Sequence, residues 1–256
     1  MPAWLYTIGT IAGVVFLWHL AVVEFVIPPY LLPPPAAIAG YIGLKWQFLI
    51  QHVWFTIYET ISGFLLSIVI GIPLAILIVW SRIMDRIITP FLVLSQTFPK
   101  VAIAPLLIIW FGLGILPKIL VSFLVAFFPI VIEGITGMRS VETEMMELIQ
   151  SMQANQFQIF WKIRLPHSLP YVFGGLKVAI AFAIVGAVVG EWVGANQGLG
   201  YLLLWANANL DTQMLFSVLI VLMAIGVILY YLIVWLEHLI IPWHVSIRET
   251  RPRPTI

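Results

Sequence analysis

The residue types that could do chemistry are few in this chain, and they are scattered. Cysteine is absent, and aspartate occurs only at positions 85 and 211. The histidines show no His-Glu-x-x-His spacing of a helical zinc site: His19, His52, His167, His238 and His244. No Gly-rich phosphate loop ending in Gly-Lys-Ser/Thr and no Gly-x-Ser-x-Gly turn occurs. We therefore expect no metal, no cofactor and no catalytic residues in this chain.

The remaining chemistry lies in ionisable residues inside apolar segments: Lys100, Glu133, Lys177 and Glu191. An unpaired charge in hydrocarbon costs several kcal/mol, so each should find a partner or face a polar pathway. We predict that Lys177 pairs with Glu133. Lys100 either faces the pathway, where it could meet an anionic substrate, or pairs with Glu59 or Glu191. Glu191, followed by a tryptophan, is expected at the outer mouth of the membrane segment that holds it, where a gate would act.

The composition places these residues in a membrane. The 256-residue chain is 62% hydrophobic and only 9% charged, against about 25% charged in soluble domains. A net charge of +1 does not provide the basic surface that binding of nucleic acid requires. Residues 1–27 lack a basic start and a small-residue cleavage site, so we interpret them as a retained span and not as a signal peptide.

Six segments are long and apolar enough to cross a bilayer, which predicts an all-α integral membrane protein: about Leu5–Ile27, Glu59–Trp80, Ile87–Gly112, Ile119–Met138, Leu169–Val193 and Leu215–Ile241. Prolines 90, 99 and 105 interrupt the third, which should not be straight. Residues 36–52 look interfacial. We divide the chain into a first span with its proline-rich loop (1–51), a multi-span transmembrane domain (52–241) and a C-terminal tail (242–256).

Basic residues orient the spans. With the N-terminus inside, the cytoplasmic segments hold Arg82, Arg86, Arg139, Lys162, Arg164, Arg248, Arg251 and Arg253. The opposite loops hold only Lys45 and Lys118. This positive-inside bias predicts that both termini are cytoplasmic and that residues 139–166 form the longest cytoplasmic loop.

That loop has the pattern of two short amphipathic helices. Apolar residues recur at helical spacing in the first: Met145, Leu148, Ile149 and Met152. Gln153-Ala154 interrupts the pattern, and Asn155 can cap the second helix. The second helix should present Phe157, Phe160 and Trp161 and end at Pro166. The loop either docks into a partner or lies on the bilayer surface, and its acidic first half favours docking.

Glycines recur every four residues in the fifth span: Gly186, Gly190, Gly194 and Gly198. Such a stripe lets another helix approach closely, either by packing within one subunit or at a subunit contact or gate. We favour packing, and we place Gly198 beyond the helix, in a turn or re-entrant element that reaches Asp211.

The cytoplasmic loop resembles the EAA loop of permease subunits of ATP-binding-cassette (ABC) importers. Glu147 holds the Glu position, and Ile163, Leu165 and Pro166 hold the closing Ile-x-Leu-Pro, whereas Leu148 and Ile149 replace two alanines. Gln153 replaces a glycine at an expected left-handed turn, where it would carry a steric cost. The resemblance implies that ATPase coupling involves Glu147, Leu148, Ile149, Gln153, Ala154, Asn155, Phe157, Phe160, Ile163, Leu165 and Pro166.

Four further stretches resemble the nitrate/sulfonate/taurine-type branch: YLLPPPAAI (30–38), TFPKVAIAPLLIIWFGLG (97–114), GAVVGEWVGANQGLGYLL (186–203) and LEHLIIPWH (236–244). The resemblance implies a homodimer with type I importer architecture in the cell (inner) membrane. It also implies cytoplasmic ATPase subunits, which use ATP and Mg, and an extracytoplasmic substrate-binding protein. The substrate could be nitrate, a sulfonate, taurine or an aromatic vitamin precursor.

An ion-coupled secondary transporter is the alternative. It would need inverted repeats and paired acidic residues near the middle of the membrane. The two halves of the chain show no similarity, and acidic residues inside the spans are few. The importer interpretation is therefore preferred, with a small-molecule substrate crossing the bilayer between two copies of the chain.

Overall fold

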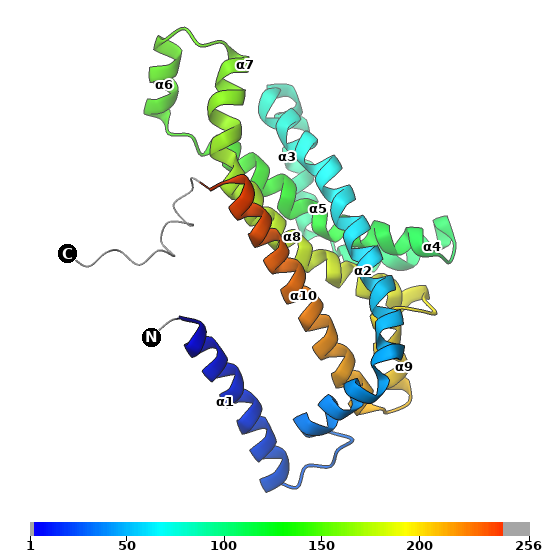
Figure 1. Cartoon of the computed structure of the whole chain (residues 1–256). Helices are drawn as coiled ribbons and strands as arrows, with labels where there is room; N and C mark the ends of the chain where they lie inside the picture. The colour runs from blue at the N-terminus through cyan, green and yellow to red at the C-terminus, as the bar shows by residue number, and fades with distance from the viewer. Residues whose placement is uncertain (1–2, 243–256) are drawn as a thin grey trace, which may run out of the picture.

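The computed structural model describes residues 3–242, and every regular element in that range is helical (Figure 1). Two helices, α5 (Ile115–Arg139) and α8 (Leu165–Gly194), pack along each other at the centre. The helices α2 (Pro35–Trp80) and α10 (Thr212–Ile240) pack against this pair. The tail from residue 243 onward, with Arg248, Arg251 and Arg253, lies outside the described residues.

Four helices are long and apolar enough to cross a membrane: α2, α5, the run Gln156–Gly194 that includes α8, and α10. A fifth apolar segment is bent: α3 (Arg82–Thr97) is followed by η1 (Lys100–Ile103) and α4 (Ala104–Phe111) at an angle of 88°, the geometry of a broken span or a re-entrant loop. This break falls at Pro99, as the prolines predicted. The first helix, α1 (Ala3–Glu24), is apolar over Ile8–Glu24, a stretch shorter than the other spans.

The second helix is much longer than its predicted span. It begins at Pro35, whose fixed φ suits the first helical turn, and it continues to Trp80 without a break. The 46 residues correspond to about 70 Å, more than twice the ~30 Å of a hydrocarbon core. Residues 36–52 are therefore helical and extend α2 on the side away from α6 and α7, with the first turns bent relative to the rest (Figure 1).

Small residues let α5 and α8 approach closely. A Cβ atom on Gly186 would lie 2.6 Å from the Cα of Ser122, and one on Gly190 would lie 2.9 Å from the Cα of Lys118. The hydroxyl of Ser122 donates to the carbonyl oxygen of Ala183 at 2.9 Å. This part of the glycine stripe therefore packs within one subunit, where close backbone contact replaces the hydrophobic burial that lipid cannot provide.

A short helix, α9 (Leu199–Ala208), joins α8 to α10 at the end of the bundle opposite α6 and α7 (Figure 1). It corresponds to the element expected beyond Gly198. Gly194 lies near the end of α8 against the side chains of Ile108 and Leu113, and Gly198 lies in the connection with φ +111°. The chain therefore turns back on itself between residues 195 and 198, and α9 packs against both α8 and α10.

Candidate functional site

The loop predicted to be cytoplasmic forms two helical segments at one end of the bundle (Figure 1). The first is α6 (Thr143–Ser151), and the second is α7 (Gln156–Ile159), followed by a π-helical turn, η2 (Phe160–Arg164). We call residues 142–166 the coupling loop. Gln153 lies at its bend with φ +59°, the left-handed conformation expected at this position. For a residue with a side chain, that conformation costs about 1–2 kcal/mol.

The bend is fixed by a capping box. The side-chain oxygen of Asn155 accepts a hydrogen bond from the backbone N–H of Gln158 at 2.8 Å. The side chain of Gln158 in turn accepts from the backbone N–H of Asn155 at 3.0 Å. These two bonds satisfy donors that a helix start otherwise leaves free, which confirms Asn155 as the cap. The capped bend therefore sets where α7 begins.

The prediction that Pro166 ends the second helix is wrong. The helical backbone runs without interruption from α7 through the π-turn into α8, and Pro166 lies in the first turn of α8. Within the π-turn, the N–H of Leu165 bonds to the carbonyl of Phe160, five residues back. Within this continuous helix the missing N–H of Pro166 removes one hydrogen bond directly after the π-turn, where the regular i→i−4 ladder is already interrupted. The coupling loop is thus continuous with a central helix.

The apolar side chains of the coupling loop divide into two groups. Leu148, Met152 and Phe157 are exposed, with exposed fractions of 62%, 74% and 62%. Phe160 was predicted on the same face but is buried, and its ring packs edge-on against Trp80 at 5.3 Å. The exposed group forms an unpartnered apolar surface, whereas Phe160 anchors the loop to the end of α2.

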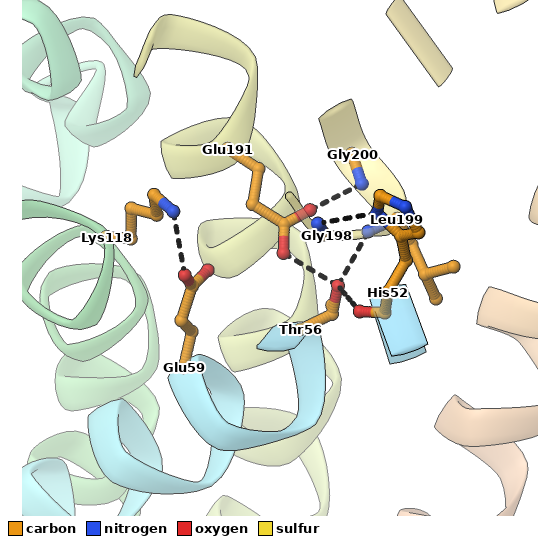
Figure 2. A network of polar contacts seen from close by, with 8 residues as sticks. All are labelled: His52, Thr56, Glu59, Lys118, Glu191, Gly198, Leu199 and Gly200. Atoms are coloured by element: carbon orange, nitrogen blue, oxygen red, sulfur yellow. Dashed lines mark hydrogen bonds and ion pairs between the residues drawn. The ribbon is translucent and has the colours of Figure 1, made fainter. Parts of the chain in front are cut away.

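The other candidate site is polar and lies around Glu191, at the end of α8 opposite the coupling loop (Figure 2). One carboxylate oxygen of Glu191 accepts from the hydroxyl of Thr56 at 2.6 Å, and the other accepts from the backbone N–H of Gly200. The Thr56 hydroxyl oxygen accepts from the N–H of Leu199 at 2.8 Å. The ring Nδ1 of His52 accepts from the N–H of Gly198 at 3.1 Å. We call the side chains of His52, Thr56 and Glu191, with these three N–H groups, the latch.

The latch is a helix cap built from two other helices. The N–H groups at the start of α9 have no carbonyl partner within their own helix. Side chains from α2 and α8 supply the acceptors instead, and all of them are buried. Glycine is required here, since a Cβ on Gly198 would lie 2.2 Å from the carboxylate carbon of Glu191, and one on Gly200 would lie 2.6 Å from the carbonyl oxygen of Val188. Sequence reasoning identified Glu191 but missed His52 and Thr56.

Buried ion pairs join the central helices, and their partners differ from the predicted ones. The Nζ of Lys118 lies 3.0 Å from Glu59 Oε1, so Lys118, predicted in an outer loop, takes the place suggested for Lys100 (Figure 2). The Nζ of Lys177 lies 2.5 Å from Glu237 on α10, so the pairing with Glu133 is wrong. Two residues along α8 correspond to about 200° of rotation. A Cβ added to Gly175 would lie 2.8 Å from the Cβ of Glu133, so the side of α8 that carries Gly175 faces Glu133. Lys177 lies on the opposite side of α8 and faces α10.

Two of the predicted pathway residues do share a cleft. Lys100 and Glu133 line a hollow of about 340 Å³ between η1, α5 and α8, and the Nζ of Lys100 lies 4.2 Å from the ring centroid of Phe128. Among residues 3–242, no group of three or more metal-ligating side chains comes together. The four predicted pathway residues therefore divide among this cleft, the latch and the Lys177–Glu237 pair.

Comparisons with known proteins agree with this architecture. Residues 67–242 match the family described as "Binding-protein-dependent transport system inner membrane component". A "Probable ABC transporter permease protein" of Haemophilus influenzae is 37% identical, covering 89% of this chain and 94% of its own length. The "Formylaminopyrimidine transport permease protein ThiX" of Halalkalibacterium halodurans is also 37% identical, covering 84% of this chain and 86% of its own.

A more distant relative and a solved structure support the branch and the fold. The "Taurine transport system permease protein TauC" of Escherichia coli is 29% identical, covering 93% of this chain and 89% of its own, in agreement with the predicted branch. A chain of the MetNI methionine ABC transporter, solved in an inward-facing conformation, superposes with a TM-score of 0.64 at 21% identity, covering 81% of this chain and 98% of that one. The chain belongs to the binding-protein-dependent ABC transport permeases, a family of inner membrane components.

Proposed function

We propose that this chain is the permease subunit of an ATP-driven importer, in which two copies form the path for a small solute. Cytoplasmic ATPase subunits, which hold ATP and Mg, dock on the coupling loop, and an extracytoplasmic binding protein delivers the solute. The observation that carries the proposal is the exposed apolar surface of α6 and α7, held by a capped bend and continuous with α8. Such a surface fits insertion into a groove on a partner.

We also propose six crossings in the inner membrane with both termini in the cytoplasm, with α1 as the first crossing. The positive-inside bias of the basic residues supports this orientation. In addition, α10 ends on the same side as α6 and α7, as a cytoplasmic C-terminus requires (Figure 1). Residues 35–52 and α9 then lie at the extracytoplasmic end, where a binding protein would release its solute.

The structure suggests different roles for the four intramembrane residues predicted on the pathway. Lys100 and Glu133 line one cleft, and we propose that they face the solute or its gate. Glu191 acts through the latch, by holding the start of α9. Lys177 pairs α8 with α10 and serves packing. A small organic solute is expected, since the ThiX relative transports formylaminopyrimidine and the TauC relative transports taurine, according to their names.

The test is reconstitution of the purified complex with its ATPase subunits and binding protein in liposomes. Phe157→Arg places a charge in the exposed apolar surface of α7 and should abolish solute-stimulated ATP hydrolysis and uptake. Phe157→Leu is the matched control, because it keeps an apolar side chain at the same exposed position and should preserve both activities. If the Phe157→Arg complex still binds its ATPases and accumulates solute at the normal rate, the docking role is wrong. Uptake by this chain alone would contradict the importer mechanism.

A further inference from the structure

The structure contains a cavity of about 540 Å³ at the end of the bundle where α9 and the first turns of α2 lie. It lies between α2, α9 and the loop after α8, with one residue of α10 completing the wall. Its volume is within the ~300–1,000 Å³ range of small-molecule sites. Neither the coupling loop nor the cleft at Lys100 contributes to it.

Aromatic rings dominate the walls of this cavity, which we call the aromatic pocket. Tyr41, Phe48 and His52 share one face of α2, at spacings of seven and four residues, and Tyr201 and Trp205 come from α9. The rings of His52 and Tyr201 are nearly parallel, with an interplanar angle of 13° and a centroid distance of 6.2 Å. The ring of Phe48 lies 4.8 Å from that of His52. Such surfaces bind flat rings by stacking, and stacking on one aromatic side chain contributes about 1–3 kcal/mol for a nucleobase.

Several polar groups at the pocket can donate a hydrogen bond or a positive charge to an anion. Lys45 contributes an ammonium group, and it forms no ion pair with any residue in the range 3–242. His52 accepts from Gly198 through Nδ1, so in the neutral ring the proton is on Nε2, which is a donor. Asn196 adds a side-chain amide. Asp211 is an acid beside the pocket, and its carboxylate accepts from the hydroxyl of Tyr41 at 3.4 Å and from the N–H of Met214 at 3.0 Å.

We propose that the aromatic pocket binds a planar aromatic solute that carries a negatively charged group, with the ring packed on the pocket wall that Tyr201 and Trp205 form beside His52 and the anion at Lys45. This inference rests on the proposed function, because it makes the pocket the first site that a released solute meets. His52 belongs both to the pocket and to the latch, so a ring stacked on it contacts the side chain that holds Gly198. The bound solute therefore lies next to the connection between α8 and α9, in which Gly198 packs against Glu191.

The test measures binding of 2-naphthoate to the full chain in nanodiscs by isothermal titration calorimetry, with empty nanodiscs subtracted. Two comparison ligands separate the contributions: cyclohexanecarboxylate keeps the charge without the aromatic ring, and 2-methylnaphthalene keeps the ring without the charge. Lys45→Met and Trp205→Leu are each expected to raise Kd at least tenfold. Trp54→Leu is the matched control, since Trp54 is an exposed tryptophan of α2 outside the pocket, and it should leave Kd unchanged.

Three results would overturn the proposal. The first is equal binding of 2-naphthoate by the wild type, Lys45→Met and Trp205→Leu chains when all three unfold at the same temperature. The second is equal affinity for 2-methylnaphthalene, which would identify the pocket as a cleft for lipid chains. The third is no saturable binding of 2-naphthoate at all. The calorimetric measurement needs no ATPase, so it is independent of the proposed permease function. A chain that does not bind 2-naphthoate but supports ATP-driven uptake would refute the proposed binding site and leave the permease function standing.

Discussion

Replacing Glu191 by alanine should release the start of α9. The change removes both acceptors of the carboxylate, so the N–H of Gly200 and the hydroxyl of Thr56 lose their partners. Each buried polar group left without a partner costs about 1–3 kcal/mol. The Thr56 hydroxyl can turn toward the carbonyl of His52, which is 3.4 Å away, so we expect a total loss of about 2–4 kcal/mol. For a chain of this size, that corresponds to a fall of roughly 5–15 °C in Tm.

Glu191→Gln is the matched control for this prediction. The amide oxygen can still accept from the N–H of Gly200, and the amide nitrogen can donate to the hydroxyl oxygen of Thr56. We expect this variant to lie within about 1 kcal/mol of the wild type. The assay combines thermal unfolding in detergent, followed by tryptophan fluorescence, with hydrogen exchange of the peptide that covers residues 196–202. If the alanine variant keeps the exchange protection and Tm of the glutamine variant, the latch does not hold α9.

Three further changes test packing, charge and strain. Gly186→Leu should lower Tm by more than 10 °C because its Cβ meets the backbone of α5 at 2.6 Å, while Gly174→Leu, with no atom within 4 Å, should not; equal Tm values would contradict the close packing. Lys118→Met should lower the free energy of unfolding by about 3–5 kcal/mol, because the Glu59 carboxylate is left buried without its partner. In chemical unfolding, the double variant Lys118→Met/Glu59→Met should recover most of this loss, and no recovery would mean that the broken ion pair is not its cause. Gln153→Gly should stabilise the coupling loop by up to about 1–2 kcal/mol, seen as slower hydrogen exchange of residues 150–158, and faster exchange would show that the left-handed bend is unstrained.

Local features of this protein could be predicted from the sequence because their partners lie nearby in the chain. The cap at Asn155 joins residues three positions apart, and the left-handed Gln153 occupies the bend before it. The break at Pro99 follows from the missing N–H and fixed φ of proline. The long apolar helices follow from composition and length alone.

Contacts between helices could not be predicted in the same way. The partner of Lys177 depends on the rotation of α8 relative to α5 and α10, which hydropathy does not reveal when a helix is apolar on all sides. Lys118 looked like a loop residue because it follows Pro117, yet it is buried in the first turn of α5. Phe160 looked like a docking residue because its own helix turn is amphipathic, but the end of α2 covers it.

The coupling loop and the latch are attached to the two ends of the same helix, α8. The 30 residues of α8 span about 45 Å, from the π-turn at the loop to Glu191 beside the latch. Glycine contacts hold α8 close to α5 along this length, so α8 and α5 are expected to move together when the loop is displaced. The latch joins two bodies, however, because Glu191 holds α9 from α8 while His52 and Thr56 hold it from α2. Any shift of α8 along α2 must therefore break the Thr56–Glu191 hydrogen bond or pull the start of α9 away from one of its two supports.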